Sequence, residues 1–264
     1  MTTVQSADGT TIAYDRKGDG PPLIIVDGAL TTRWSGSKPQ LADRLAQTFS
    51  VYVYDRRGRG DSGDTLPYAV DREIEDISAV IAIADAPVFL YGHSSGACLA
   101  LEAAAVLGAK VGRLALHEAP YNDDPANQDA WRKYLATLSS ALADGRRGDA
   151  VAAFMTLVGM PPEQIDGMRH SPFWPVAESI APTLAYDHLG VMGVDGTVPV
   201  ELVGRVGVPT LVLYGEMSPR FMAETARTLA KSMPLATLRG LDGQTHDVDP
   251  AALAPALIEF AGRR

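Results

Sequence analysis

The sequence has a single cysteine, no long hydrophobic run and fewer basic than acidic residues. One cysteine, Cys98, excludes an intrachain disulfide and a cysteine-rich zinc site. The 23 Lys and Arg against 32 Asp and Glu give a net charge of −9, which disfavours general electrostatic binding to nucleic acid or anionic lipid. The most apolar stretch, residues 97–109, is interrupted by Glu102 and is too short to span a bilayer.

The rest of the composition is that of an ordinary globular protein. Of 264 residues, 46% are hydrophobic and 21% are charged, which indicates one large domain or one domain with a sizeable insertion. Residues 1–9 are polar and lack the basic and apolar regions of a secretory signal, so we expect a cytoplasmic protein with no nucleic-acid or membrane partner. No metal-ligand spacing is present, and we expect no metal and no cofactor. Monomer and homodimer both stay open.

Apolar runs typical of strands alternate with helical patterns, which predicts a mostly parallel sheet covered by helices on both faces. About eight strands are expected, near residues 3–6, 11–15, 23–26, 51–54, 88–91, 114–117, 210–214 and 237–239. Helical patterns cover residues 40–47, 72–84, 95–107, 220–232 and 251–261.

Residues 121–206 break this alternation. They contain no strong strand pattern, but they show helical patterns over 131–143 and 150–158, followed by sequence rich in Pro and aromatic residues. A structureless stretch of this length is improbable inside a compact domain. We therefore predict a core domain formed by residues 1–120 and 207–264, with a helical lid inserted over 121–206.

The most specific motif is Gly92-His93-Ser94-Ser95-Gly96, which follows one predicted strand and opens a predicted helix. This is G-x-S-x-G in the strand–turn–helix context that a nucleophile elbow requires. The turn exposes the Ser94 side chain, and the N–H group of Ser95 at the helix N-terminus can stabilise a developing oxyanion. Ser94 is therefore the predicted nucleophile.

A serine hydroxyl needs a neighbouring base. His246 follows the last predicted strand, where a loop can reach the serine at the carboxyl edge of the sheet, and it is the predicted general base. The other histidines have different expected places: His93 is in the elbow, His117 ends a strand beside Glu118, and His170 and His188 lie in the insertion.

Together with Asp55-Arg56-Arg57-Gly58-Arg59-Gly60-Asp61-Ser62 after the fourth strand, these motifs resemble the α/β-hydrolase superfamily over the whole chain outside the insertion. The resemblance implies the α/β-hydrolase fold and an oxyanion hole in which a backbone N–H of Gly28 or Ala29 joins that of Ser95. The loop that usually reads His-Gly there reads Asp27-Gly28 here.

The acid of the triad is missing from its usual place in the superfamily. The segment after the seventh strand reads Gly215-Glu216-Met217-Ser218-Pro219, with Ser218 where an Asp is expected. A serine cannot stabilise an imidazolium as a carboxylate does. Glu118, at the end of the sixth strand, is the predicted replacement because it reaches the same edge of the sheet, and Glu216 is the rival.

This arrangement is similar to the zearalenone-lactonase branch of the superfamily, whose Ser-His-Glu triad takes its Glu from a His-Glu-x-Pro segment after the sixth strand. The matching segments are Asp27-Gly28, Ser94-Ser95-Gly96-Ala97, His117-Glu118-Ala119-Pro120 and Ser218-Pro219. The insertion does not visibly match, so the resemblance does not extend to the substrate.

The predicted activity is hydrolysis of an ester or lactone bond of an apolar small molecule through an acyl-enzyme on Ser94. Trp131, Trp174 and Tyr186 of the insertion are the candidate substrate contacts, with Trp174 expected in a loop between Pro172 and Pro175. The alternative is a protein of the same fold that binds a hydrophobic small molecule or steers a non-hydrolytic reaction, such as a rearrangement or C–C bond chemistry.

Overall fold

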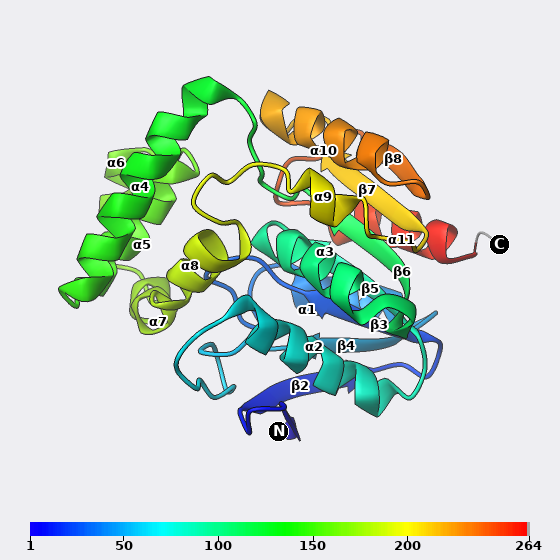
Figure 1. Ribbon diagram of the computed structural model, residues 1–264. Coiled ribbons are helices and arrows are strands. Elements are labelled where there is room, and N and C mark those ends of the chain that lie inside the picture. The colour runs from blue at the N-terminus through cyan, green and yellow to red at the C-terminus, as the bar shows by residue number, and fades with distance from the viewer. Residues whose placement is uncertain (263–264) are drawn as a thin grey trace.

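One sheet forms the centre of the computed structural model, which describes residues 1–262 (Figure 1). The strand order is β1-β2-β4-β3-β5-β6-β7-β8. β1 and β2, and β2 and β4, pair antiparallel, whereas all other neighbours are parallel. The strands are β1 (Thr2–Gln5), β2 (Thr11–Lys17), β3 (Pro22–Val26), β4 (Ser50–Tyr54), β5 (Val88–His93), β6 (Val111–His117), β7 (Thr210–Gly215) and β8 (Ala236–Leu241).

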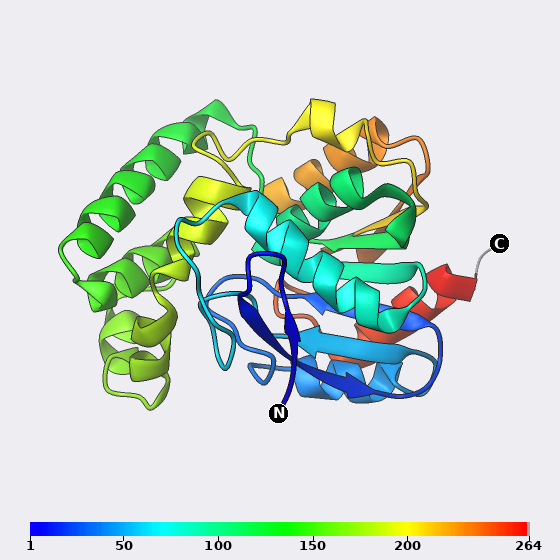
Figure 2. The same cartoon turned by 60° about the horizontal axis from the view of Figure 1, so that its bottom comes forward.

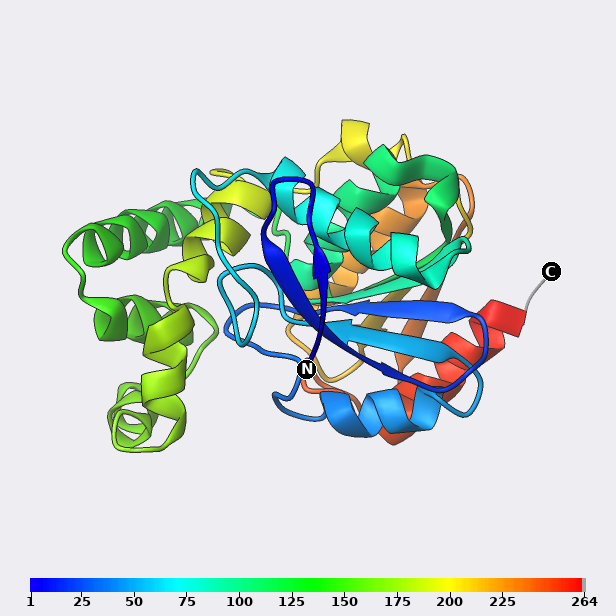
Figure 3. The same ribbon diagram turned by 90° about the horizontal axis from the view of Figure 1, so that it is seen from below.

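Helices cover both faces of the sheet, as the near-continuous burial of β3, β4 and β5 requires. Figure 3 shows one pair of helices below the sheet and the others above it. The pair is α1 (Lys38–Leu45) and α11 (Pro250–Gly262), and the opposite face carries α2 (Val70–Ala84), α3 (Ser95–Leu107) and α10 (Arg220–Ser232). A short 3-10 turn, η1 (Gly108–Lys110), joins α3 to β6. The predicted fold class, a mostly parallel α/β sheet, is confirmed.

The segment between β6 and β7 consists of helices and connecting loops, and its part from residue 125 to 180 projects to one side of the sheet (Figure 2). It contains α4 (Pro125–Ala143), α5 (Arg147–Leu157), α6 (Pro162–Met168), α7 (Phe173–Ile180), α8 (Thr183–Ala185), the π-helix η2 (Tyr186–Val191) and α9 (Val200–Val203). We call residues 121–206 the helical segment. It has its own cluster of buried apolar side chains, which also includes Leu30 from the loop after β3.

The prediction of a loop around Trp174 was wrong, because Trp174 lies in α7. Pro172 precedes the helix and Pro175 is its third residue. The N–H groups of a first helical turn have no intrahelical partner, so prolines there break no hydrogen bond.

The register of the parallel strands brings their ends to a common edge. Val26 pairs with Gly92, and His93 pairs with His117. The residues that directly follow β3, β5 and β6 are Asp27, Ser94 and Glu118. Three separate segments of the chain therefore meet at the carboxyl ends of adjacent strands.

Candidate active site

Ser94 occupies a tight turn between β5 and α3. Its φ of 56° and ψ of −132° lie in a region that L-residues with side chains rarely adopt. The turn is possible because strand and helix pass very close: a Cβ added to Gly92 would lie 2.4 Å from the carbonyl oxygen of Gly96. A Cβ added to Gly96 would in turn lie 2.3 Å from the carbonyl oxygen of Val26. The side chain of Ser94 is left partly exposed at the carboxyl edge of the sheet.

Positive φ values concentrate at this edge. Among residues 1–262, the non-glycine residues with positive φ are Leu30, Asp85, Ser94 and Glu118, and all except the helix-ending Asp85 follow a central strand. Strained backbone of this kind persists only where the surrounding structure imposes it, and it clusters at functional sites.

Glu118 and His246 form a short hydrogen bond at this edge. Nδ1 of His246 lies 2.6 Å from Oε2 of Glu118, whose side chain is fully buried, while 36% of the His246 side chain is exposed. The other carboxylate oxygen, Oε1, accepts the N–H of Gly215 at 2.7 Å. Burial alone would raise the pKa of Glu118, but its polar interactions with His246, the Ser218 side chain and the Gly215 N–H outweigh burial and hold the pKa below its ordinary value. Glu118 is therefore a carboxylate at neutral pH.

The rival acid points elsewhere. Glu216 is exposed, and its carboxylate lies beside Gly240, where a Cβ on Gly240 would meet Oε1 of Glu216 at 2.5 Å. Ser218 holds the usual place of the acid but carries no charge, and its hydroxyl is buried close to Gly215. The carboxylate that meets His246 therefore comes from the end of β6.

The loop after β3 lies directly against the elbow. A Cβ on Gly28 would come within 2.9 Å of the Ser94 Cβ and 3.4 Å of its Oγ. Ala29 follows Gly28, and the N–H of Ser95 belongs to the first turn of α3. The structure thus places Gly28 and Ser95 beside Ser94, and Ala29 follows Gly28 in the chain.

A row of histidine rings adjoins the Glu118–His246 pair. The His93 ring lies between those of His246 and His117, with centroid distances of 4.7 and 5.0 Å. Nε2 of His93 donates to the carbonyl oxygen of His246 at 3.1 Å, because a carbonyl oxygen can only accept. Burial lowers the pKa of His117 to about 4 and that of His93 well below its ordinary value, so both rings are neutral at pH 7. His93 thereby ties the His246 loop to the elbow.

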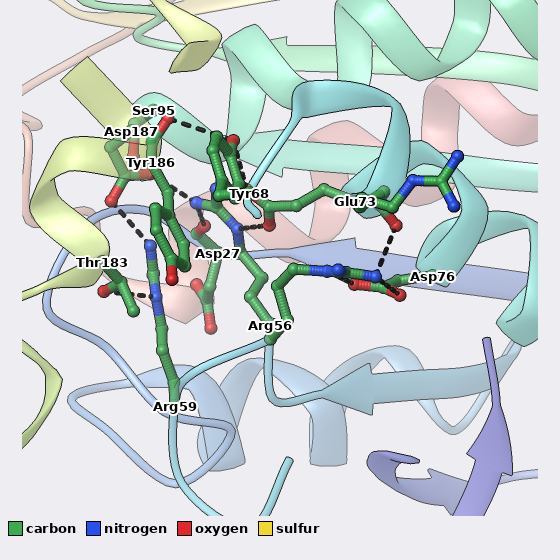
Figure 4. A network of polar contacts seen from close by, with 12 residues as sticks. Asp27, Arg56, Arg59, Tyr68, Glu73, Asp76, Ser95, Thr183, Tyr186 and Asp187 are labelled. Atoms are coloured by element: carbon green, nitrogen blue, oxygen red, sulfur yellow. Dashed lines mark hydrogen bonds and ion pairs between the residues drawn. The ribbon is translucent and has the colours of Figure 1, made fainter. Parts of the chain in front are cut away.

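A buried charged network connects the helical segment to the same edge (Figure 4). Asp187, in η2, accepts from Arg56 Nη1 at 2.5 Å and from Arg59 Nη2 at 2.6 Å. Its Oδ1 also accepts the Ser95 hydroxyl at 2.8 Å. Glu73 binds the other side of the Arg56 guanidinium through two hydrogen bonds of 2.6 and 2.7 Å. Burial alone would raise the pKa of Asp187, but Arg56 and Arg59 lower it to about 2.

Sequence reasoning missed this network. It used Arg56, Arg57 and Arg59 as part of the motif after the fourth strand and gave them no partners, whereas the structure buries all three to 2% exposure or less. The signal available was the position of the arginines directly after a buried strand, where long charged side chains are found only if they are paired. Nothing in the sequence around Asp187 distinguishes it from other acidic residues of the helical segment.

The predicted substrate contacts lie in three different environments. Trp131, on α4, is partly exposed and packs near the His188 ring, and its indole nitrogen is buried without a hydrogen-bond partner among the described residues. Trp174 is 4% exposed inside the apolar cluster of the helical segment and donates to Glu178 at 3.1 Å. Tyr186 stacks on Tyr68 at 3.9 Å. Only Trp131 combines partial exposure with an unpaired polar atom.

Comparison with known proteins gives the family. The model of the Alpha/beta hydrolase family matches residues 28–256, and the chain belongs to this family. A solved structure of an alpha/beta hydrolase from Sphaerobacter thermophilus DSM 20745 shares 49% identity with a TM-score of 0.86, over 98% of this chain and 100% of that one. The resemblance to the superfamily is therefore confirmed, whereas membership of the zearalenone-lactonase branch stays a prediction.

Other known proteins share part of the sequence or the fold alone. N-formylmaleamate deformylase from Pseudomonas putida strain KT2440 is 38% identical over 156 residues, which are 56% of this chain and 57% of that protein. The chain thus matches little more than half the length of this curated relative. The enol-lactonase from Burkholderia xenovorans LB400 has a TM-score of 0.70 at 20% identity, over 99% of this chain and 100% of that one.

Residues 1–262 contain neither a metal-binding cluster nor a membrane-spanning helix. No group of three or more His, Cys, Asp or Glu side chains is arranged to hold a metal ion. Within the same part of the chain, no helix has the length and apolarity needed to cross a bilayer.

Proposed function

We propose that this protein is a serine hydrolase that cleaves an ester or lactone bond of an apolar small molecule through an acyl-enzyme on Ser94. The observation that carries the proposal is the 2.6 Å hydrogen bond between buried Glu118 and His246, beside a nucleophile elbow. Because Nδ1 of His246 is committed to Glu118, the opposite ring nitrogen, Nε2, is the one available to accept a proton.

The proposed reaction follows from these roles of the two His246 ring nitrogens. Nε2 of His246 takes the hydroxyl proton as Ser94 Oγ attacks the carbonyl carbon, and the buried carboxylate of Glu118 stabilises the imidazolium that results. The same proton then passes to the leaving oxygen, which departs as an alcohol or, from a lactone, remains attached to the acyl group. Water, deprotonated by His246, hydrolyses the acyl-enzyme and regenerates Ser94.

The tetrahedral anion needs donors that are already in place. The N–H of Ser95 and an N–H of Gly28 or Ala29 are the proposed pair, since Gly28 and Ser95 adjoin Ser94 and Ala29 follows Gly28. Removal of one such donor typically lowers the rate about 100- to 1000-fold.

The helical segment supplies an apolar surface near these donors. Its buried cluster includes Leu30, and Ala29, Trp131 and Phe154 pack against it with part of their surface exposed. An apolar acyl or alcohol group is the proposed occupant of this surface. We propose that this segment acts as the lid of the site.

The proposal is tested by intact mass after treatment with a fluorophosphonate probe. Wild type is expected to gain one probe mass at Ser94, and Ser94→Ala is expected to gain none. Because the relatives include an enol-lactonase and a deformylase, the substrate panel then holds aryl esters, lactones and N-formyl amides.

Absence of labelling in wild type, under conditions that label a reference serine hydrolase, would refute the mechanism. The alternative would then be favoured, namely a protein of this fold that binds a hydrophobic small molecule or steers a non-hydrolytic reaction.

A further inference from the structure

The buried network around Asp187 touches the carbonyl oxygens of the loop after β3. Arg56 Nη1 donates to the carbonyl oxygen of Asp27 at 3.2 Å. Arg59 Nη1 donates to that of Gly28 at 2.5 Å, and the Thr31 hydroxyl donates to the same oxygen at 2.7 Å. Arg56 also binds Asp187 through Nη1, the same nitrogen that binds Asp27. Arg59 binds Asp187 through its other terminal nitrogen, Nη2. One carboxylate from the helical segment therefore fixes both guanidinium groups against this loop.

Because the peptide bond is planar, these contacts also fix the directions of the Gly28 and Ala29 N–H groups. The peptide bonds that join Asp27, Gly28 and Ala29 are trans. In a trans peptide the C=O and the following N–H point in opposite directions. Holding the Asp27 carbonyl oxygen thus sets the direction of the Gly28 N–H, and holding the Gly28 carbonyl oxygen sets that of the Ala29 N–H.

The same carboxylate reaches the third donor. Asp187 Oδ1 accepts the hydroxyl of Ser95, whose backbone N–H is the donor on the elbow side. Asp187 and both arginines are 2% exposed or less, so water does not replace these contacts. Low effective dielectric strengthens each of them relative to a surface pair.

We infer that Asp187 is a positioning residue that orients the amides of Gly28, Ala29 and Ser95 through Arg59, Arg56 and the Ser95 hydroxyl. This inference rests on the proposed function, because it presupposes that an oxyanion forms at Ser94. Asp187 itself touches no reacting atom.

The test separates stabilisation of the oxyanion from binding of the substrate. An aryl trifluoromethyl ketone is the probe: Ser94 Oγ adds to its carbonyl carbon, the proton passes to His246, and the former carbonyl oxygen becomes an alkoxide in the oxyanion hole. Its inhibition constant is measured beside the kcat and KM for a p-nitrophenyl ester. Asp187→Asn is expected to lower kcat at least about tenfold and weaken the ketone by a similar factor, with KM changed less than about threefold.

Asp76→Asn is the matched control. Asp76 is 1% exposed and forms a two-point pair with Arg57, at 2.7 and 2.8 Å, but Arg57 has no contact with the Asp27–Gly28 loop among those of the described residues. This variant loses a buried ion pair of the same kind, so thermal stability falls while kcat and the ketone inhibition constant stay within about threefold of wild type. An equal loss of kcat in both variants would overturn the inference and leave only a structural role.

Arg59→Lys tests the same positioning role if Asp187→Asn does not fold. Lysine keeps the positive charge beside Asp187, but its single ammonium lacks the separate nitrogens that bind Asp187 and Gly28 at once. We expect the same combined loss of kcat and ketone affinity, and a folded Arg59→Lys with wild-type values would overturn the inference. If wild type neither hydrolyses the ester nor binds the ketone, the proposed function fails and this inference fails with it. If wild type does both and the folded variants match it, only this inference fails.

Discussion

Replacing Glu118 with glutamine tests the origin of the triad acid most directly. The carboxylate accepts two hydrogen bonds, from Gly215 N–H at 2.7 Å and from His246 Nδ1 at 2.6 Å. In Glu118→Gln the amide oxygen can keep the bond from Gly215, which leaves the amide NH₂ facing His246. That group can only donate, so Nδ1 must accept and the ring proton moves to Nε2. His246 is then unable to take the proton of Ser94.

The size of the expected fall in kcat follows from two losses: the correct His246 tautomer and the negative charge that stabilises the imidazolium. Substitutions of this type in Ser-His-Asp enzymes lower kcat about 10⁴-fold, which corresponds to about 5 kcal/mol of transition-state stabilisation. The fold should persist, because glutamine is nearly isosteric and keeps the bond to Gly215.

The assay is steady-state hydrolysis of an aryl ester together with the rate of fluorophosphonate labelling, for wild type, Glu118→Gln and Glu216→Gln. Glu216 is an exposed carboxylate beside Gly240, so its substitution is expected to leave both rates within about twofold of wild type. A folded Glu118→Gln that keeps more than a tenth of the wild-type rate would refute the assignment of Glu118 as the acid. A large loss in Glu216→Gln would move the role to the loop after β7.

Three further outcomes are expected. Gly28→Ala places a methyl group 2.9 Å from the Ser94 Cβ, so ester turnover should fall about 100-fold and the melting temperature should fall as the loop and the elbow move apart. Unchanged turnover would remove this loop from the oxyanion hole. The pKa of Asp187 is lowered from 3.8 to about 2, so its ionisation adds about 2 kcal/mol to the free energy of unfolding above pH 4, and this contribution is lost as the pH falls towards 2. The unfolding free energies of wild type and Asp187→Asn, measured in urea, should therefore converge as the pH falls through that window. A constant difference between them would contradict the shift. Trp174→Ala removes a side chain from the interior of the helical segment and should lower the free energy of unfolding by about 3–5 kcal/mol. The fluorophosphonate labelling rate of the folded variant should stay close to that of wild type. A loss of labelling without a loss of stability would place Trp174 in the substrate site.

The strands and the elbow were predictable because their signals are local. An apolar run directly before Gly92-His93-Ser94-Ser95-Gly96, and a helical pattern directly after it, define strand, turn and helix without any long-range information. The pairing of Glu118 with His246 also followed from a simple rule, since residues at the ends of parallel strands share one edge of the sheet.

The network around Asp187 was not predictable, because the contacts of Asp187 itself join residues 92 to 131 positions apart. Each partner has an ordinary interpretation on its own: an acidic residue in an insertion, or an arginine in a basic cluster. Their burial and pairing arise only when the helical segment docks on the core. The helix around Trp174 was missed for a different reason, since prolines that flank a tryptophan suggest a loop unless they fall in a first helical turn.

The origin of the carboxylate on β6 has a consequence for how this scaffold tolerates change. Ser94 and Glu118 follow adjacent strands joined by the N–H of Ser94 to the carbonyl oxygen of His117, so one stretch of sheet pairing fixes the spacing between hydroxyl and carboxylate. The connection after β7 is left with backbone roles: the Gly215 N–H binds Glu118, and the Met217 N–H donates to the carbonyl oxygen of Gln244 at 2.9 Å, two positions before His246. The exposed side chains of Glu216 and Met217 are accordingly free to vary, whereas a peptide insertion between them would break the attachment of the His246 loop.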